Sequence, residues 1–128
     1  MPRLASDDWR EWLEYARSDY EEATSALSRG SFREACFHAQ QSCEKLLKAV
    51  LIKRGAFMPI HDLTELAREV GVEEPTLLNK LSKLTIHYHT SRYPDAARRA
   101  KVEYDLRKAE ECVEVMRELW GTLGKRLE

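Results

Sequence analysis

The sequence predicts an all-α fold, an up-and-down bundle of three long and two short helices, from two observations. Apolar residues recur at every third or fourth position through most of the chain, which is the period of one helix face. No segment shows the alternation of apolar and polar residues, bounded by turn residues, that indicates a β-strand. A chain of 128 residues without linkers or repeats forms one domain, so we expect residues 1–128 to make a single helical unit.

Two long helices are expected in the first part of the chain. The first begins at Asp8 and ends before Gly30, and the second ends near Gly55. Residues Ser31 to Glu34 have the capping-box pattern that starts the second helix. The two apolar stripes are Trp9, Leu13, Ala16, Tyr20, Ala23 and Leu27, then Cys36, Ala39, Cys43, Leu46 and Val50. Because the junction is so short, the helices must form an antiparallel hairpin.

Two short helices and a third long one follow. Residues 62–65 have the capping pattern of a helix that ends at Gly71, and Pro75 suits the first turn of the next helix. The segment 87–104 is the least regular part of the sequence. Asp105 is expected to cap the last helix. The stripe of that helix is Leu106, Ala109, Val113, Met116, Trp120, Leu123 and Leu127.

The composition excludes several classes of protein. With 43% hydrophobic and 34% charged residues the chain is globular, and a net charge of −1 gives no long-range attraction to nucleic acid or membrane. Any phosphate-binding surface must therefore be a local patch. No apolar run spans a bilayer and the first residues lack a signal-peptide core, so we expect a cytoplasmic protein without membrane contact.

The three cysteines are expected to be reduced core residues. Their odd number does not suit a disulfide framework. Cys36 and Cys43 share a helix face, but their Cα atoms lie about 10 Å apart along the axis. That distance is too long for a disulfide or for two ligands of one zinc ion. We expect no metal site, and Cys112 is treated as a small core residue in the same way.

The second helix carries a polar face opposite its apolar stripe. His38, Gln41, Lys45 and Lys48 share this face, and Glu44 lies beside them. One interpretation is a solvated face stabilised by a Glu44–Lys48 ion pair. The other is a row of donors that faces a cleft and holds phosphate oxygens.

His87 and His89 flank Tyr88 just before Arg92 and Tyr93. In a helix the two histidines would point to nearly opposite sides, and in a strand they would lack a third ligand, so a metal site is disfavoured. One interpretation is acid–base or phosphate chemistry, with a histidine beside the Arg92 guanidinium. The alternative is that Tyr88 packs inward while both histidines fringe a helix end.

A short run of positive charge adjoins an aromatic ring before the last helix. Its members are Arg92, Arg98, Arg99 and Lys101, with Tyr93 between them. This combination suits single-stranded nucleic acid or a nucleotide, through base stacking and phosphate neutralisation. The alternative is a solvated run that Asp95 and Glu103 dilute. The sequence contains no glycine-rich phosphate loop, paired-cysteine motif or zinc-protease motif.

Three motifs, in matching order, resemble the HEPN domain family. Residues 36–49, CFHAQQSCEKLLKA, are similar to its signature of an aromatic residue, a glutamine pair and Glu-Lys-x-x-Lys-Ala. Residues 59–63 resemble its proline and His-x-Leu entry to the third helix. Residues 92–95 resemble its Arg-Tyr-Pro element, and the similarity runs from the first helix to the last.

The resemblance implies a homodimeric helical bundle that acts with a minimal nucleotidyltransferase partner in a toxin–antitoxin pair. Relatives bind nucleoside triphosphates or cleave RNA without metal. We therefore expect a nucleotide- or RNA-binding module without a cofactor other than a bound nucleotide. Its phosphate-binding residues would be Gln41, Lys45, Lys48, Arg92 and Tyr93. Aromatic side chains off the main stripes also favour a dimer, namely Trp12, Tyr15 and Phe37.

Two alternatives stay open, a metal-independent ribonuclease and a purely structural helical dimer. The ribonuclease branch of the family depends on an arginine followed four to six residues later by a histidine. Here His87 and His89 precede Arg92, while Arg54 and His61, with six residues between them, have that spacing in the loop after the second helix. His61 is read as a residue that caps a helix or tethers this loop. A ribonuclease would need His87 or His89 as the base beside Arg92.

Overall fold

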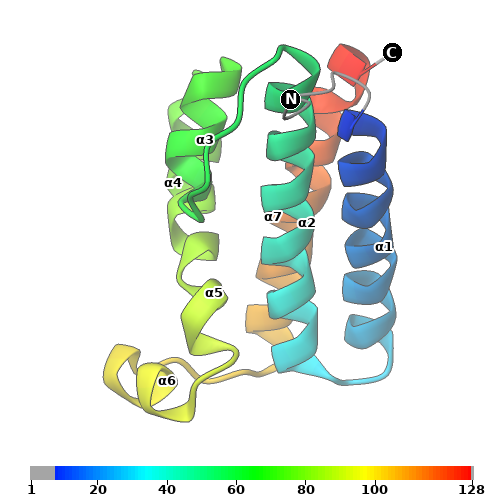
Figure 1. The fold of residues 1–128 in the computed structure, drawn as a ribbon. Coiled ribbons are helices and arrows are strands. Elements are labelled where there is room, and N and C mark those ends of the chain that lie inside the picture. The colour runs from blue at the N-terminus through cyan, green and yellow to red at the C-terminus, as the bar shows by residue number, and fades with distance from the viewer. Residues whose placement is uncertain (1–7, 128) are drawn as a thin grey trace.

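The structure, a computed structural model, describes residues 8–127, and this part of the chain consists of helices joined by loops (Figure 1). Three long helices run side by side: α1 (Asp8–Ser28), α2 (Phe32–Lys53) and α7 (Leu106–Leu123). Between α2 and α7 come α3 (Leu63–Val70), α4 (Pro75–Thr85), α5 (His87–Thr90) and α6 (Pro94–Ala100). A 3₁₀ helix, η1 (Gly124–Leu127), follows α7. The predicted all-α bundle is confirmed, and within residues 8–127 no helix has the length and apolar character that crossing a membrane requires.

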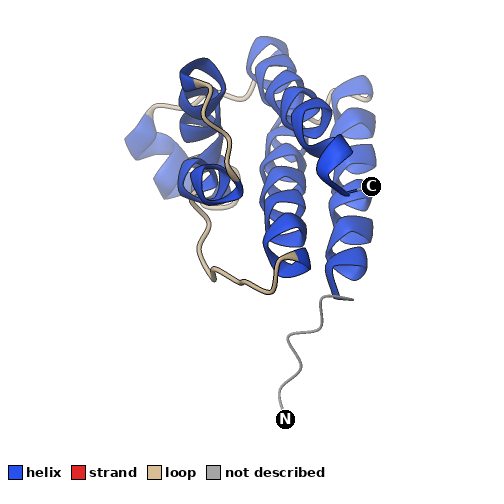
Figure 2. Ribbon diagram, turned by 90° about the horizontal axis from the view of Figure 1, so that it is seen from above, coloured by secondary structure: helices blue, strands red, loops and turns tan. Residues whose placement is uncertain are grey.

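Helix α2 is the centre of the bundle. It packs against α1, α3, α4, α5 and α7, and most of its residues are buried. Seen from above, α2 lies between α1 on one side and the short helices on the other (Figure 2). The largest fully buried apolar side chains are Leu46, Leu47, Leu63, Leu66, Leu77, Leu81, Met116, Leu119 and Leu123. Helix α1 begins, and η1 ends, at the end of the bundle that lies away from α6 (Figure 1).

The α1–α2 junction is as short as predicted. The predicted capping box at the start of α2 is wrong. Ser31 is the N-cap of α2, yet its side chain makes no capping hydrogen bond. Its backbone N–H donates to the Ala26 carbonyl at 2.8 Å, so this donor is no longer available to the Glu34 carboxylate. Gly30 has φ of 78°, the left-handed conformation that lets the chain reverse within two residues.

Four other predicted helix ends are confirmed. Asp62 caps α3 by accepting hydrogen bonds from two backbone N–H groups of its first turn, and Gly71 ends that helix with φ of 105°. Pro75 is in the first turn of α4. Asp105 caps α7 by accepting from the Lys108 N–H at 2.8 Å.

The segment 87–104 is more regular than the sequence indicates. It contains the single turn of α5 and the two turns of α6, so four short α-helices replace the two that were predicted. Pro94 starts α6, where its fixed φ is favourable, and Lys101 ends it with φ of 55°. Leu106 was placed in the apolar stripe of α7 but is 52% exposed, because it is the first residue of that helix, at the end of the bundle.

One buried hydroxyl joins the three long helices. Ser42 of α2 is fully buried, and its Oγ donates to the Ala16 carbonyl of α1 at 2.8 Å. The same Oγ accepts from Nε1 of Trp120 on α7 at 2.9 Å. The indole of Trp120 also meets Tyr20 of α1 edge to face, with ring centroids 5.4 Å apart.

We predict that Ser42→Ala lowers the free energy of unfolding by about 1–3 kcal/mol, because it leaves the Trp120 N–H and the Ala16 carbonyl without their partner. Urea denaturation measures the change. Thr122→Ala is the matched control, since that hydroxyl bonds only a carbonyl of its own exposed helix face. It should change stability by less than about 0.5 kcal/mol. Equal effects for the two variants would contradict the proposed role of Ser42.

Candidate functional site

A buried carboxylate organises the polar face of α2. Glu44 is 5% exposed and accepts hydrogen bonds from Lys48 Nζ at 2.8 Å and from Gln40 Nε2 at 3.0 Å. His61, from the loop before α3, adds a third contact, with Nδ1 3.0 Å from both carboxylate oxygens. The predicted tethering role of His61 is confirmed, because Glu44 fixes this loop against α2.

His61 continues the network to α5. Its ring stacks on Tyr88, with centroids 3.8 Å apart and an interplanar angle of 17°. The Arg92 guanidinium carbon lies 5.0 Å from the Tyr88 ring centroid, 5.6 Å from that of Phe37 on α2, and 5.7 Å from that of Tyr93. Among residues 8–127, no carboxylate forms an ion pair with Arg92. The polar face of α2 and the segment after α4 therefore meet on one side of the molecule.

A second network ties α1 to the same face of α2. The buried Asp19 carboxylate accepts from Lys45 Nζ at 2.6 Å and contacts His38 Nδ1 at 2.8 Å. Burial alone would raise the pKa of Asp19, but the hydrogen bonds to His38 and Lys45 outweigh it and lower the pKa below its usual value. The Lys45 amine also lies 5.9 Å from the centroid of the exposed Tyr15 ring.

The side chains of α2 that were predicted to bind phosphate already have hydrogen-bond or ion-pair partners within the protein. Lys45 is paired with Asp19, and Lys48 is paired with Glu44 and only 4% exposed. Gln41 Nε2 donates to Gln40 Oε1 at 2.7 Å. The predicted Glu44–Lys48 ion pair exists, but it is buried, so the interpretation as a solvated surface pair is wrong. The reason is aromatic cover: the Lys48 amine lies under the rings of Trp12 and Phe57, 5.8 and 5.7 Å from their centroids.

The two candidate catalytic histidines point to different sides of α5. His87 is 3% exposed, and its Nδ1 contacts the Tyr104 hydroxyl at 2.7 Å. Burial lowers the pKa of His87 to about 4, so the ring is neutral at pH 7. His89 is exposed, with its ring centroid 4.8 Å from that of Tyr88. The alternative in which Tyr88 packs inward and both histidines fringe the helix is therefore wrong, because His87 is the inward-facing residue.

The other basic residues of the predicted run before α7 lie on α6 or at its C-cap, at one end of the bundle (Figure 1). Arg98, Arg99 and Lys101 are all exposed. Arg99 forms an exposed ion pair with Asp95 at 3.3 Å, as the dilution of this charge run suggested. Arg92 is thus the member of the cluster that aromatic rings hold in place.

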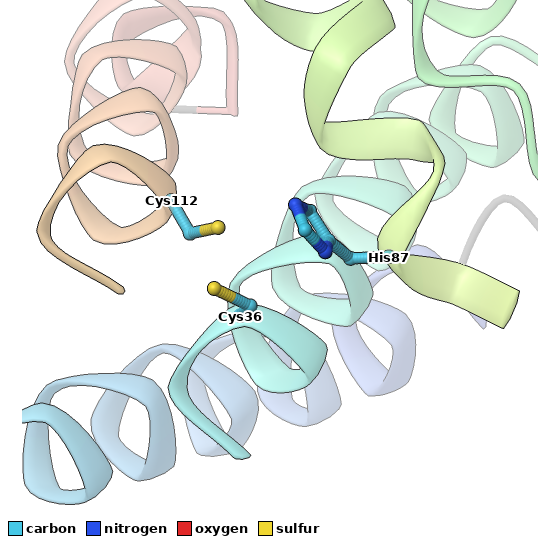
Figure 3. A group of neighbouring side chains, drawn as sticks. All are labelled: Cys36, His87 and Cys112. Carbon is cyan, nitrogen blue, oxygen red and sulfur yellow. The ribbon is translucent and has the colours of Figure 1, made fainter. Parts of the chain in front are cut away.

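A cluster of three side chains on the buried side of α5 was not predicted from the sequence. His87 lies with Cys36 of α2 and Cys112 of α7, and one ligand atom from each residue lies within 4.8 Å of the other two (Figure 3). The hydrogen bond with Cys36, followed by burial, raises the pKa of the Cys112 thiol well above its usual range. The only sequence signal was the residue types themselves, since the three are far apart in the chain.

The helical bundle and its polar α2 face define a HEPN domain. The chain matches the model of the HEPN domain over residues 9–127 and belongs to that family. Among curated proteins it is 30% identical to Putative toxin MJ1304 of Methanocaldococcus jannaschii, over 80% of this chain and 76% of that protein.

Two solved structures have the same fold. TT1696 from Thermus thermophilus superposes with a TM-score of 0.81 and 28% identity, over 92% of this chain and 97% of the other. ST0689, described as an archaeal HEPN homologue, gives a TM-score of 0.74 and 28% identity, with both chains fully covered.

Proposed function

We propose that this chain is a toxin-like HEPN module that binds the phosphate of a nucleotide or RNA beside α5. The observation that carries the proposal is the Arg92 guanidinium, which lies near the rings of Phe37, Tyr88 and Tyr93 and has no carboxylate partner among the described residues. The similarity to a relative whose name is Putative toxin MJ1304 supports the toxin-like role.

The chemistry of this surface suits a phosphate next to a base. An arginine presents paired N–H donors that match phosphate oxygens, and the surrounding rings limit the conformations that its side chain must lose on binding. Tyr93 is 48% exposed and offers a face on which a base stacks. Arg98 and Lys101 add positive charge nearby, which a chain of net charge −1 needs locally.

The α2 residues that were predicted to bind phosphate have different roles in this proposal. Phe37, Gln41 and Lys45 follow one another at intervals of four residues, so they share a helix face that starts beside Arg92. We assign Gln41 and Lys45 to the rim of the site. Lys48 belongs to its scaffold, because withdrawing it from buried Glu44 would cost roughly 3–5 kcal/mol.

We predict that Arg92→Ala weakens binding about 10- to 100-fold, the value of one charge-assisted hydrogen-bonding group. Binding is measured as the rise in melting temperature with ATP, GTP or an RNA oligomer in magnesium-free buffer. Ligand at 100 times Kd stabilises a protein by about 2.7 kcal/mol. Arg99→Ala is the control, since Arg99 is on the neighbouring helix and is paired with Asp95. The absence of any shift for the wild type would favour the purely structural dimer.

A second candidate function is metal-independent RNA cleavage, with His61 as the base. The specific observation is that Glu44 holds His61 Nδ1, which leaves Nε2 to accept a proton, while Arg92 contacts the same Tyr88 ring. His87 is buried on the other side of α5, so it does not suit this role. Arg54 does not suit it either, because its guanidinium donates to the Val70 carbonyl at the end of α3.

The reaction would use neighbouring groups of the RNA. His61 takes the proton of a 2′-hydroxyl, the 2′-oxygen bonds to the adjacent phosphorus, and the bond from phosphorus to the 5′-oxygen breaks. The leaving oxygen takes up a proton from water, which gives a 2′,3′-cyclic phosphate and a 5′-hydroxyl, and His61 later releases its proton to solvent. Arg92 stabilises the added charge on the phosphate.

If this candidate is correct, the protein cleaves RNA in EDTA, and His61→Ala lowers the rate about 10²- to 10⁴-fold, the usual contribution of a general base. Gel analysis of a labelled oligomer follows the reaction. His38→Ala is the matched control, because His38 is also held by a carboxylate, Asp19, but in the other network. RNA binding without cleavage would leave the binding module and exclude the ribonuclease.

We also propose that the module is a homodimer that acts with a minimal nucleotidyltransferase chain. Support for self-association comes from an aromatic patch on α1 and the loop after α2, made of Trp12, Tyr15 and Phe57. Tyr15 is 60% and Phe57 43% exposed, and the rings of Trp12 and Phe57 are 5.8 Å apart. An exposed apolar patch beside a polar face is typical of a protein interface.

Sedimentation equilibrium should give about twice the chain mass of 14.9 kDa at micromolar concentration. Tyr15→Asp with Phe57→Asp should give the monomer, because burying two unpaired carboxylates opposes association. Leu106→Asp is the control, since Leu106 is exposed at the start of α7, where a negative charge is tolerated. A monomeric wild type would remove the dimer from the proposal.

A further inference from the structure

We propose that Cys36, His87 and Cys112 bind a zinc ion in the interior of the bundle, at a site separate from the Arg92 surface. The three side chains come from α2, α5 and α7 and are directed toward one another (Figure 3). They are 0%, 3% and 4% exposed. Two thiolates and one imidazole form a ligand set that favours zinc among common cellular metals.

The spacing of the ligand atoms is close to what zinc requires. One ligand atom from each residue lies within 4.8 Å of the other two. In a tetrahedral site, zinc–sulfur bonds of about 2.3 Å and zinc–nitrogen bonds of about 2.0 Å place these atoms roughly 3.5–3.8 Å apart. Contraction by about 1 Å, within reach of side-chain rotation, completes three of the four ligands.

The surroundings of His87 orient its ring for this role. Nδ1 contacts the Tyr104 hydroxyl at 2.7 Å and the Thr90 hydroxyl at 3.3 Å, and the two hydroxyls are 2.8 Å from each other. Because Nδ1 is engaged in this way, Nε2 is the nitrogen that remains for the ion. Metal-binding histidines commonly have such a partner on the second nitrogen, which fixes the tautomer and the ring orientation.

Charge and proton balance are also satisfied. Each thiol loses one proton on binding, so the ion replaces two protons, which leave to solvent. Two thiolates neutralise the double charge of zinc, and the buried site therefore carries no net charge. Before binding, the Cys36 thiol contacts the Lys108 carbonyl at 3.6 Å, a weak hydrogen bond that zinc coordination replaces.

A pocket gives the ion a route to solvent and a fourth ligand. His87 and Cys112 both line a pocket of about 750 Å³ between α4 and α7, whose lining also includes Lys80, Lys108 and Glu118. A water molecule from this pocket is the fourth ligand in our proposal. Three protein ligands and one open position distinguish such a site from the closed, four-ligand sites that serve structure alone.

The test measures zinc in the full-length protein, purified under reducing conditions, by mass spectrometry of the metal. Wild type should hold, or take up after EDTA treatment, one zinc per chain. Cys36→Ala and Cys112→Ala should weaken binding by more than about 100-fold, since even the hydrogen-bond partners of metal ligands are worth 10- to 100-fold. Cys43→Ala is the matched control: Cys43 is buried on α2 like Cys36 but is outside the cluster, and this variant should keep its zinc.

Two further measurements do not depend on a ligand variant that folds. Cobalt(II) added to the metal-free wild type should give a thiolate-to-cobalt absorption band, which Cys43→Ala keeps. Tyr104→Phe, which removes only the hydroxyl beside Nδ1, should weaken zinc binding about 10- to 100-fold.

Three results would overturn the proposal. They are a reduced wild type that shows neither zinc uptake nor the cobalt band, a folded Cys112→Ala that retains zinc, and a native Cys36–Cys112 disulfide with no zinc uptake after reduction. None of them bears on Arg92, so nucleotide or RNA binding is judged separately.

Discussion

The α2–α5 face depends on one constraint, the need of the buried Glu44 carboxylate for hydrogen-bond donors. A charge at 5% exposure in a helical core is stable only when several donors surround it. Lys48 and Gln40 come from the same helix, but His61 must be brought by the loop before α3. Its position then determines where Tyr88 stacks, and Tyr88 in turn supports Arg92. The carboxylate thus sets the position of a guanidinium that it does not touch.

Periodicity predicted the long helices, and capping residues predicted most helix ends, because both depend on neighbours in the sequence. Asp62, Gly71, Pro75 and Asp105 act within one turn of their own helix, and each behaves as the pattern indicated. Ser31 does not, since a carbonyl of the preceding helix takes its N–H. The turns of α5 and α6 were missed because one or two turns are too short to show a helical repeat.

The site was less predictable than the fold, because a polar stripe looks the same in a sequence whether water or another element covers it. The stripe on α2 is polar, as the sequence indicates, but Lys48 lies beneath the rings of Trp12 and Phe57 and not in water. The position of His61 is fixed by its contact with Glu44, which is 17 residues away in the chain. Cys36 was compared with Cys43 on its own helix, whereas its neighbours in space are His87 and Cys112. Only packing brings such residues together.

The two ends of the described chain share a feature that helps any study of this surface. Helix α1 starts, and η1 finishes, at the end of the bundle that lies away from α6 (Figure 1). A fluorophore attached to the first turn of α1 or to η1 is therefore held at a distance from α6, which carries Arg98. Protein labelled in this way should bind ligands at the α6 end of the bundle without steric interference from the label.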